Sequence, residues 1–191
     1  MDGLAWRPDP GAPDADELLG RLERLGGRGA LVAPDGHGKS TLLDALAKRL
    51  TDTGHTLRRL TASRDRPLPR RDLRAFRHRV GGGDALLLDG AGHLGPWRWW
   101  RVRRVARRAA VLVVTLHRPG RLPTLAVCTT SPQLLGELID ELLAAADPTL
   151  DLPELPSATE LHARHAGNVR NALRELYDRC AGRATVGPDH D

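Results

Sequence analysis

Residues 30–51 read ALVAPDGHGKSTLLDALAKRLT, an apolar run followed by a glycine-rich turn and an amphipathic stretch. The run from 30 to 33 is short and apolar, which predicts a buried strand. In the amphipathic stretch, Leu42, Leu43, Leu46 and Leu50 recur at the spacing of one helical face, which predicts a helix from Lys39 to about Thr51. A strand, a turn and a helix in this order are the building unit of a parallel sheet covered by helices.

The turn itself has the composition of a phosphate-binding loop. Its residues match the template G-x-x-x-x-G-K-[ST], with alanine in the place of the first glycine, and they are Ala33, Pro34, Asp35, Gly36, His37, Gly38, Lys39, Ser40 and Thr41. Glycines allow successive backbone N–H groups to face a phosphate, and the helix that follows adds its N-terminal donors. We therefore expect a P-loop that binds ATP with Mg²⁺, in which Lys39 reaches the β- and γ-phosphates and Ser40 contacts the metal. The alternative is a chance glycine-rich turn before a helix.

A second buried strand ends in a carboxylate. Residues 85–89 read ALLLD, and Asp89 lies 49 positions after Ser40. An aspartate at the end of a buried strand can hold Mg²⁺ directly or through water. The alternative is that Asp89 only caps the following turn.

Two further segments carry polar residues at the end of an apolar run or the start of a helix. The strongest strand signal is AVLVVT at 110–115, which ends at Thr115 and is followed by His117 and Arg118. Near the C-terminal end, HAGNVRNAL at 165–173 places Arg170 in the first turn of an expected helix, with Asn168 as its N-cap.

ALLLDGAGHL, at 85–94, resembles the Walker B segment of AAA-type (ASCE) P-loop NTPases. The resemblance implies that Asp89 holds Mg²⁺, that Thr115 is a sensor of the γ-phosphate or lytic water, and that Arg170 is a second sensor in a lid. The alternatives are that Thr115 is an ordinary strand end before a turn, and that Arg170 is simply exposed on a helix capped by Asn168. His117 is similar to the histidine after the corresponding strand of ABC-type ATPases. The Walker B is degenerate, because Gly90 stands where the family carries a catalytic glutamate. Fast hydrolysis, partner-stimulated turnover and binding alone all stay open, with His93 and Asp84 as other groups that could polarise water.

Strands alternating with helices indicate a three-layer α/β sandwich, a P-loop NTPase fold with a parallel sheet of about five strands and a short C-terminal helical segment. We expect a flexible arm at 1–15, the P-loop core at 16–146, a small helical lid-like segment at 147–182 and a frayed tail at 183–191. The proline-rich stretch at 147–156 sets the boundary between core and lid.

The composition of the chain limits which classes of protein and cellular location fit it. The chain has 191 residues, 40% of them apolar, and a net charge of +5. Of its 29 basic residues 27 are arginine, so the positive charge fits a general preference for arginine over lysine as well as an acidic partner. The two cysteines form no metal or disulfide pattern, and no signal peptide or apolar span of about 18 residues is present. These features predict a cytoplasmic, bacterial-type protein with no membrane partner.

The stretch PWRWWRVRRVARR at 96–108 predicts a basic helix that contains three of the four tryptophans. Arg101, Arg104 and Arg108 share one face. Arginine with tryptophan suits nucleic acid through Arg98–Arg108, and it also suits a protein partner. The alternative is a solvated face with Val102, Val105 and Trp100 turned to the core.

Together these patterns predict an ATP-binding AAA-like protein, an ATPase or a nucleotide-dependent switch that acts with a protein partner or as a homo-oligomer. A small-molecule kinase and a catalytically silent NTP-binding adaptor are the alternatives.

Overall fold

Five parallel strands form the centre of the fold, in the order β2-β3-β4-β1-β5. The computed structural model describes residues 13–65, 68, 74, 78–146 and 153–182. The strands are β1 (Arg28–Val32), β2 (Thr56–Thr61), β3 (Asp84–Asp89), β4 (Val111–Leu116) and β5 (Thr124–Val127). β4 lies between β1, which leads into the P-loop, and β3, which ends in Asp89. The predicted three-layer P-loop NTPase sandwich with a parallel sheet of about five strands is confirmed.

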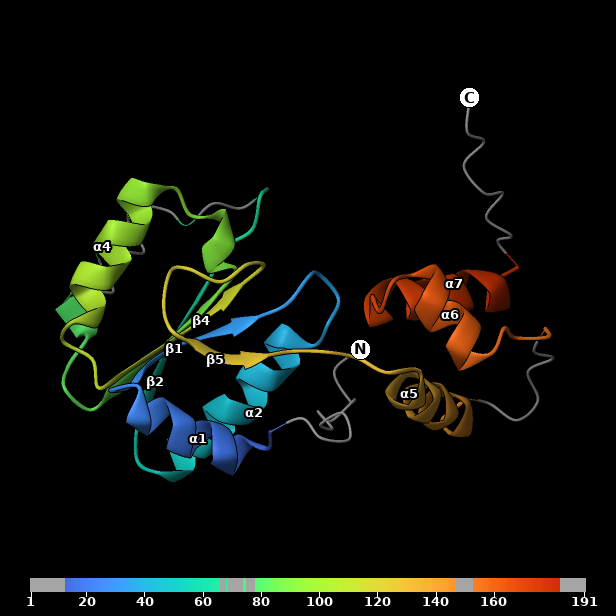
Figure 1. Cartoon of the computed structure of the whole chain (residues 1–191), viewed down its shortest axis with the longest axis horizontal. Helices are drawn as coiled ribbons and strands as arrows, with labels where there is room; N and C mark the ends of the chain where they lie inside the picture. The colour runs from blue at the N-terminus through green and yellow to red at the C-terminus, as the bar shows by residue number, and fades with distance from the viewer. Residues whose placement is uncertain (1–12, 66–67, 69–73, 75–77, 147–152, 183–191) are drawn as a thin grey trace.

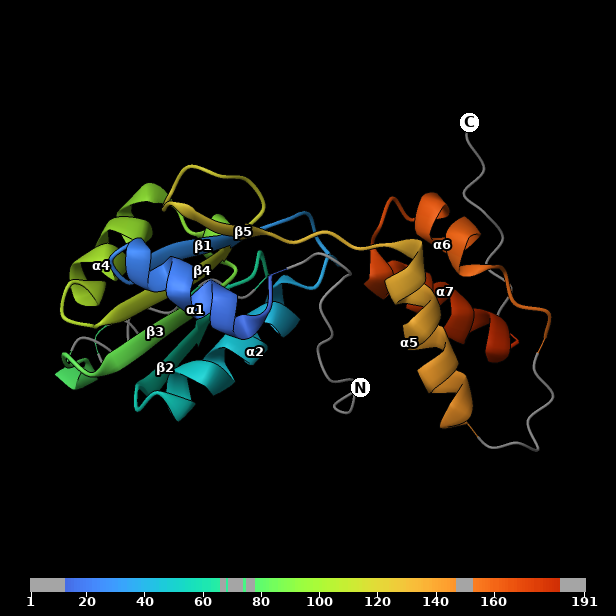
Figure 2. The same ribbon diagram turned by 60° about the horizontal axis from the view of Figure 1, so that its bottom comes forward.

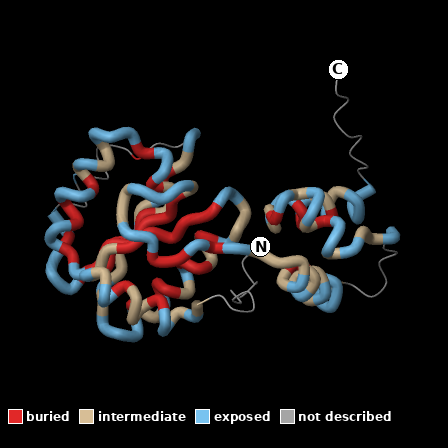
Figure 3. The backbone as a smooth tube through the Cα atoms, in the orientation of Figure 1, coloured by how far each residue is buried: buried red, intermediate tan, exposed pale blue. Residues whose placement is uncertain are grey.

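Helices cover both faces of this sheet (Figures 1 and 2). On one face, α1 (Ala15–Arg24) and α2 (Lys39–Asp52) bury leucines such as Leu18, Leu43 and Leu46 against β1, β3 and β4. On the other face, the 3₁₀ turn η1 (Ala91–His93) and α4 (Pro96–Ala106) bury a second apolar cluster that includes Val102 and Val105. The central strands β1, β3 and β4 are buried almost throughout (Figure 3), as expected for a parallel sheet with two covered faces.

The last three helices form a separate group beyond the carboxyl ends of the strands (Figure 1). They are α5 (Pro132–Ala144), α6 (Ala158–Arg164) and α7 (Val169–Cys180), and they share a small core around Leu135, Leu161 and Leu173. By packing, the boundary of the lid therefore lies before α5 and not at residue 146. The proline-rich stretch that suggested residue 146 joins two helices of the same group.

The helix ends follow from local sequence. Asp14 caps α1 by accepting a hydrogen bond from the Glu17 backbone N–H at 2.7 Å, and Ser157 forms a capping box with Glu160 at the start of α6. The expected arm lies mostly, and the expected tail wholly, outside the described residues. Within the described part of the chain, no helix is long and apolar enough to cross a membrane.

Candidate nucleotide-binding site

The P-loop connects the end of β1 to the start of α2 at the carboxyl edge of the sheet. Gly36 and Gly38 have φ values of 77° and 74°, in the left-handed region that glycine adopts without strain. Gly38 is the N-cap of α2, and no side chain caps the first turn. The first N–H groups of α2 are therefore available to an anion, as expected for a phosphate-binding loop.

Lys39 lies folded back along this loop. Its Nζ atom donates hydrogen bonds to the backbone oxygens of Ala33, at 2.7 Å, and Pro34, at 2.5 Å, and it lies 3.9 Å from Oδ1 of Asp35. Burial lowers the pKa of the Lys39 ammonium from its ordinary value, and the negative charge of Asp35 opposes this shift. The Lys39 ammonium is buried and hydrogen-bonded to neutral carbonyl oxygens at the start of the loop. A bound phosphate can replace these oxygens as its hydrogen-bond partner.

Asp89 is the centre of a hydroxyl network. The Ser40 Oγ donates to Oδ2 of Asp89 at 2.8 Å, and the Thr115 Oγ1 donates to Oδ1 at 2.7 Å. The backbone N–H of Gly90 donates in turn to the Thr115 Oγ1 at 2.7 Å. The register of the sheet explains this meeting, because Leu88 pairs with Val114 and so sets Asp89 beside Thr115. The structure thus brings together three of the residues that the sequence proposed.

The oxygen ligands at this point fit Mg²⁺. Ser40 and Asp89 offer a hydroxyl and a carboxylate, and Mg²⁺ commonly binds through one or two such groups together with water and phosphate oxygens. Among the described residues, no group of three histidine, cysteine or acidic side chains could hold a metal on its own. A magnesium ion here would therefore depend on a bound nucleotide for its remaining ligands.

Gly90 has a backbone that leaves no room for the glutamate of the family pattern. Its φ is 77°, and a Cβ placed on it would lie 1.8 Å from the backbone oxygen of Ala62. Ala62 is held in turn, since its N–H donates to the backbone oxygen of Asp89 at 2.8 Å. The departure from the family pattern therefore involves the backbone as well as the missing side chain.

Two histidines lie beside the Walker B turn. The ring centroids of His93 and His117 are 5.1 Å apart in an edge-to-face arrangement, and His117 Nε2 lies 3.5 Å from Oδ1 of Asp35. Partial burial lowers the pKa of His117, with Asp35 opposing this effect and Lys39 adding to it. A neutral imidazole oriented by a carboxylate is a suitable proton acceptor. Asp84 lies at the other end of β3, where it pairs with Arg58.

The lid contacts the P-loop through the first residues of α7. The Val169 N–H donates to the backbone oxygen of Gly36 at 3.2 Å, and a Cβ on Gly36 would lie 1.9 Å from Oδ1 of Asn168. Asn168 also caps α7, as predicted, by accepting from the Asn171 N–H at 3.0 Å. Arg170 is exposed, and its charge contributes to the lowered pKa of Lys39. The proposed second sensor therefore begins a helix that touches the loop it would sense.

His37 adds to the same contact. Its Nδ1 lies 2.9 Å from the backbone oxygen of Asp35, and its Nε2 would lie 2.9 Å from a Cβ on Gly167. Thr130, at the end of the β5 segment, donates to the backbone oxygen of Gly167 at 2.7 Å. The P-loop turn at Gly36 and His37 thus packs closely against the turn at Gly167 and Asn168 that precedes α7.

Three residues, two beside the site and Arg28 at the opposite edge of the sheet, have contacts that the sequence did not reveal. Arg121 donates to the backbone oxygens of Ala91 and Leu94. Arg28 donates to the backbone oxygens of Ala106, Ala109 and Ala110 at the end of α4. Cys128 is buried close enough to Lys39 to interact with its charge, and burial raises the pKa of its thiol to about 11. These contacts depend on tertiary structure and have no local sequence signal.

Comparisons with known proteins give similarity in structure only. No family model and no curated protein matches the chain. A DNA replication initiation factor has a TM-score of 0.59 at 15% identity, with 88% of this chain and 60% of that chain covered. The Holliday junction branch migration motor RuvB of Thermotoga maritima has a TM-score of 0.56 at 19% identity, with 85% and 59% covered. The replication initiator DnaA bound to AMPPCP and single-stranded DNA has a TM-score of 0.55 at 16% identity, with 84% and 58% covered.

The alignments include most of this chain but only about 60% of each neighbour. In this chain β4 separates the P-loop strand from the strand that ends in Asp89. The fold of this chain is that of the AAA-type (ASCE) P-loop NTPases.

Proposed function

We propose that this chain binds ATP together with Mg²⁺ and acts as a nucleotide-dependent switch with slow or partner-stimulated hydrolysis. The observation that carries the proposal is the hydrogen-bonded set of Ser40, Asp89 and Thr115 beside the buried ammonium of Lys39. This set supplies a cation for the phosphates and oxygen ligands for a metal within one small region. The structure of the neighbour DnaA contains the ATP analogue AMPPCP, which supports the same class of ligand.

Each residue of the set has a definite task in this proposal. Lys39 exchanges its two carbonyl partners for the β- and γ-phosphates, while the N–H groups of residues 36–41 bind phosphate oxygens. Ser40 and Asp89 hold Mg²⁺, which neutralises phosphate charge when it is bound. Thr115 is released from Asp89 and orients its hydroxyl toward the γ-phosphate or the attacking water.

The absence of a carboxylate at position 90 makes rapid hydrolysis by the isolated chain unfavourable. His117, oriented by Asp35, is our candidate for the group that accepts a proton from water. A partner protein or a second copy of the chain would supply further stabilising charge. The neighbours include a replication initiator and a branch migration motor, which supports a macromolecular partner.

The lid would transmit nucleotide state to that partner. Arg170 lies in the first turn of α7, the helix whose N-terminus contacts Gly36, so a γ-phosphate that attracts its guanidinium would move α7 relative to the P-loop. Helices α5 and α6 would move with it because the three share one apolar core. A cytoplasmic location stays a prediction from the sequence.

The test is nucleotide binding and phosphate release, with and without Mg²⁺, on wild type and on Asp89→Asn. We expect Mg²⁺ to strengthen binding to wild type and to have little effect on Asp89→Asn. Asp140→Asn, an exposed change on α5, is the matched control and should behave as wild type. An equal response to Mg²⁺ in all three proteins would contradict the proposed metal site.

Gly90 also favours a second function, a catalytically silent NTP-binding adaptor. The same experiment separates the two, since an adaptor binds nucleotide but releases no phosphate above the uncatalysed rate with or without a partner. Measurable release that His117→Gln abolishes would exclude the silent adaptor.

A further inference from the structure

Helix α4 presents two large aromatic rings to solvent. Trp97 is 61% exposed and Trp100 is 48% exposed, and their rings are stacked with centroids 5.1 Å apart and planes 16° apart. The core does not require them, because Trp99 is the tryptophan of this helix that packs against the apolar cluster. The alternative of a solvated face placed Val102, Val105 and Trp100 toward the core. The two valines are buried, whereas Trp100 is exposed and Trp99, one position or about 100° away around the helix, packs there instead.

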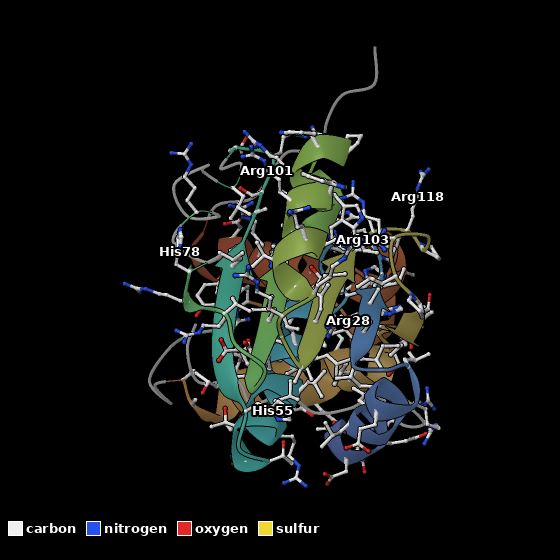
Figure 4. The ribbon with its side chains drawn as sticks, turned by 90° about the vertical axis from the view of Figure 1, so that its left-hand side faces the viewer. Arg28, His55, His78, Arg101, Arg103 and Arg118 are labelled. Atoms are coloured by element: carbon white, nitrogen blue, oxygen red, sulfur yellow. The ribbon has the colours of Figure 1, made fainter. Side chains whose placement is uncertain are left out.

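Arginines accompany these rings. The guanidinium of Arg101 lies 5.4 Å from the centre of the Trp97 ring, and that of Arg104 lies 5.7 Å from Trp100. We call these four residues the Trp–Arg stripe. Figure 4 shows Arg101 and Arg103 on opposite flanks of α4, so positive charge surrounds the stripe.

The charge of this helix is unbalanced. Residues 96–108 contain six arginines and no acidic residue. Among the described residues, Arg98, Arg101, Arg103, Arg104 and Arg107 form no ion pair, whereas arginines of the opposite face, such as Arg21 on α1 and Arg49 on α2, pair with neighbouring carboxylates. Unpaired guanidiniums in such a row create a positive field that attracts a polyanion.

Both ends of α4 are held by partly buried contacts that do not involve the four residues of the stripe. At the N-terminal end, Arg121 donates to the backbone oxygens of Ala91 and Leu94 and stacks 5.4 Å from Trp99. At the C-terminal end, Arg28 donates to the backbone oxygens of Ala106 and Ala109, at 3.0 and 2.8 Å. A stripe on a fixed helix loses little conformational entropy when it binds a ligand.

We propose that the Trp–Arg stripe of α4 binds single-stranded nucleic acid. Guanidiniums recognise phosphates, and exposed indole rings stack on unpaired bases, whose faces are covered by neighbouring bases in a duplex. Tryptophan and arginine are also frequent at protein interfaces, so residue type alone does not select the partner. An acidic protein is the less favoured partner because residues 96–108 carry only positive charge, which matches the uniformly negative phosphate backbone of a nucleic acid.

The binding is tested with a fluorescently labelled oligothymidylate of about 20 nucleotides, followed by anisotropy at 50 and 200 mM salt without nucleotide. We expect the single strand to bind more tightly than a duplex of the same length. Because each phosphate contact contributes about 0.7 to the salt slope of a single strand, Arg101→Gln with Arg104→Gln should lower the slope by about 1.4.

Changes to the rings should have a different effect. Trp97→Ala with Trp100→Ala should weaken binding at least about fivefold with little change of the salt slope, while phenylalanine at both positions should restore most of it. The matched control, Arg24→Gln with Arg174→Gln, removes the same charge from exposed positions on α1 and α7 and should lower affinity by less than about twofold. Circular dichroism checks that every variant is folded.

Three results would overturn the proposal: no binding of the single strand at 50 mM salt, tighter binding of the duplex, or an equal loss in the control variant. Binding of an acidic protein without any binding of nucleic acid would also overturn it. Lys39→Ala should leave this binding unchanged, so failure of the stripe and failure of the nucleotide site can be distinguished.

Discussion

Replacing Gly90 by glutamate restores the residue type of the family pattern, and we expect it to damage the protein without creating a catalytic base. Gly90 has left-handed backbone angles, with φ 77° and ψ 29°. A Cβ there would lie 1.8 Å from the Ala62 backbone oxygen, a distance at which the backbone must move.

The cost can be built from these two features. A residue with a Cβ loses about 1–2 kcal/mol in the left-handed region. Insertion of extra atoms into a packed region costs about 1–3 kcal/mol more. The free energy of unfolding should therefore fall by about 2–5 kcal/mol, which is a large part of the stability of an ordinary domain.

Urea unfolding followed by circular dichroism measures this change. Gly83→Glu is a matched control, because Gly83 precedes the same strand, has an ordinary φ and has nothing within 4 Å of its Cβ position. Gly90→Ala separates the effect of the Cβ and backbone from that of the carboxylate, and it should already show most of the loss. Phosphate release by Gly90→Glu should not exceed that of wild type.

A Gly90→Glu protein that is as stable as Gly83→Glu and hydrolyses ATP several-fold faster than wild type would refute this reasoning. It would mean that the turn after Asp89 adapts easily and that the site lacks only a side chain.

Three further predictions concern the lid, the proton acceptor and the support of α4. Gly36→Ala should loosen the contact between P-loop and lid and speed hydrogen exchange of α7 in the free protein, whereas Gly38→Ala, which shares the left-handed φ but has nothing within 4 Å, should not. Phosphate release should fall as pH drops through the pKa of His117, which lies below its ordinary 6.5, because a histidine must be neutral to accept a proton. His117→Gln should lower the rate and remove this acidic fall from the plot of rate against pH. Arg28→Met should cost about 2–4 kcal/mol in urea unfolding because it leaves the carbonyls at the end of α4 without their donor, while Arg24→Met should change stability by less than about 0.5 kcal/mol.

The sequence predicted the central strands of the sheet well because β1, β3 and β4 are short apolar runs. Residues 56–61 read TLRRLT, a mostly polar stretch that gives only a weak strand pattern, yet they form β2 at the edge of the sheet. The P-loop was readable because its function depends on local backbone geometry, so glycines and lysine must occur at fixed spacing. Thr115 was found for a related reason, since it ends the strand beside β1.

The remaining features depend on contacts between distant segments. The apolar face of α5 would suit a sheet as well as other helices, so nothing in its sequence assigned it to the lid. The left-handed turn at Gly90 depends on Ala62, and the partner of His117 is Asp35, 82 positions earlier in the chain. Val102 and Val105 of α4 face the core as the alternative of a solvated face placed them, but the adjacent Trp99 and Trp100 are both aromatic, so the pattern did not show which of the two rings packs on the core.

The central claim is tested most directly by titrating ATP in the presence of Mg²⁺ into wild type and Lys39→Ala, with the heat of binding as the signal and circular dichroism as the check of folding. We predict saturable binding to wild type and loss of at least about tenfold in affinity for Lys39→Ala, because the ammonium that meets the phosphates is gone. Equal binding to the two folded proteins, or no binding to wild type, would contradict the assignment of residues 33–41 as a nucleotide-binding loop.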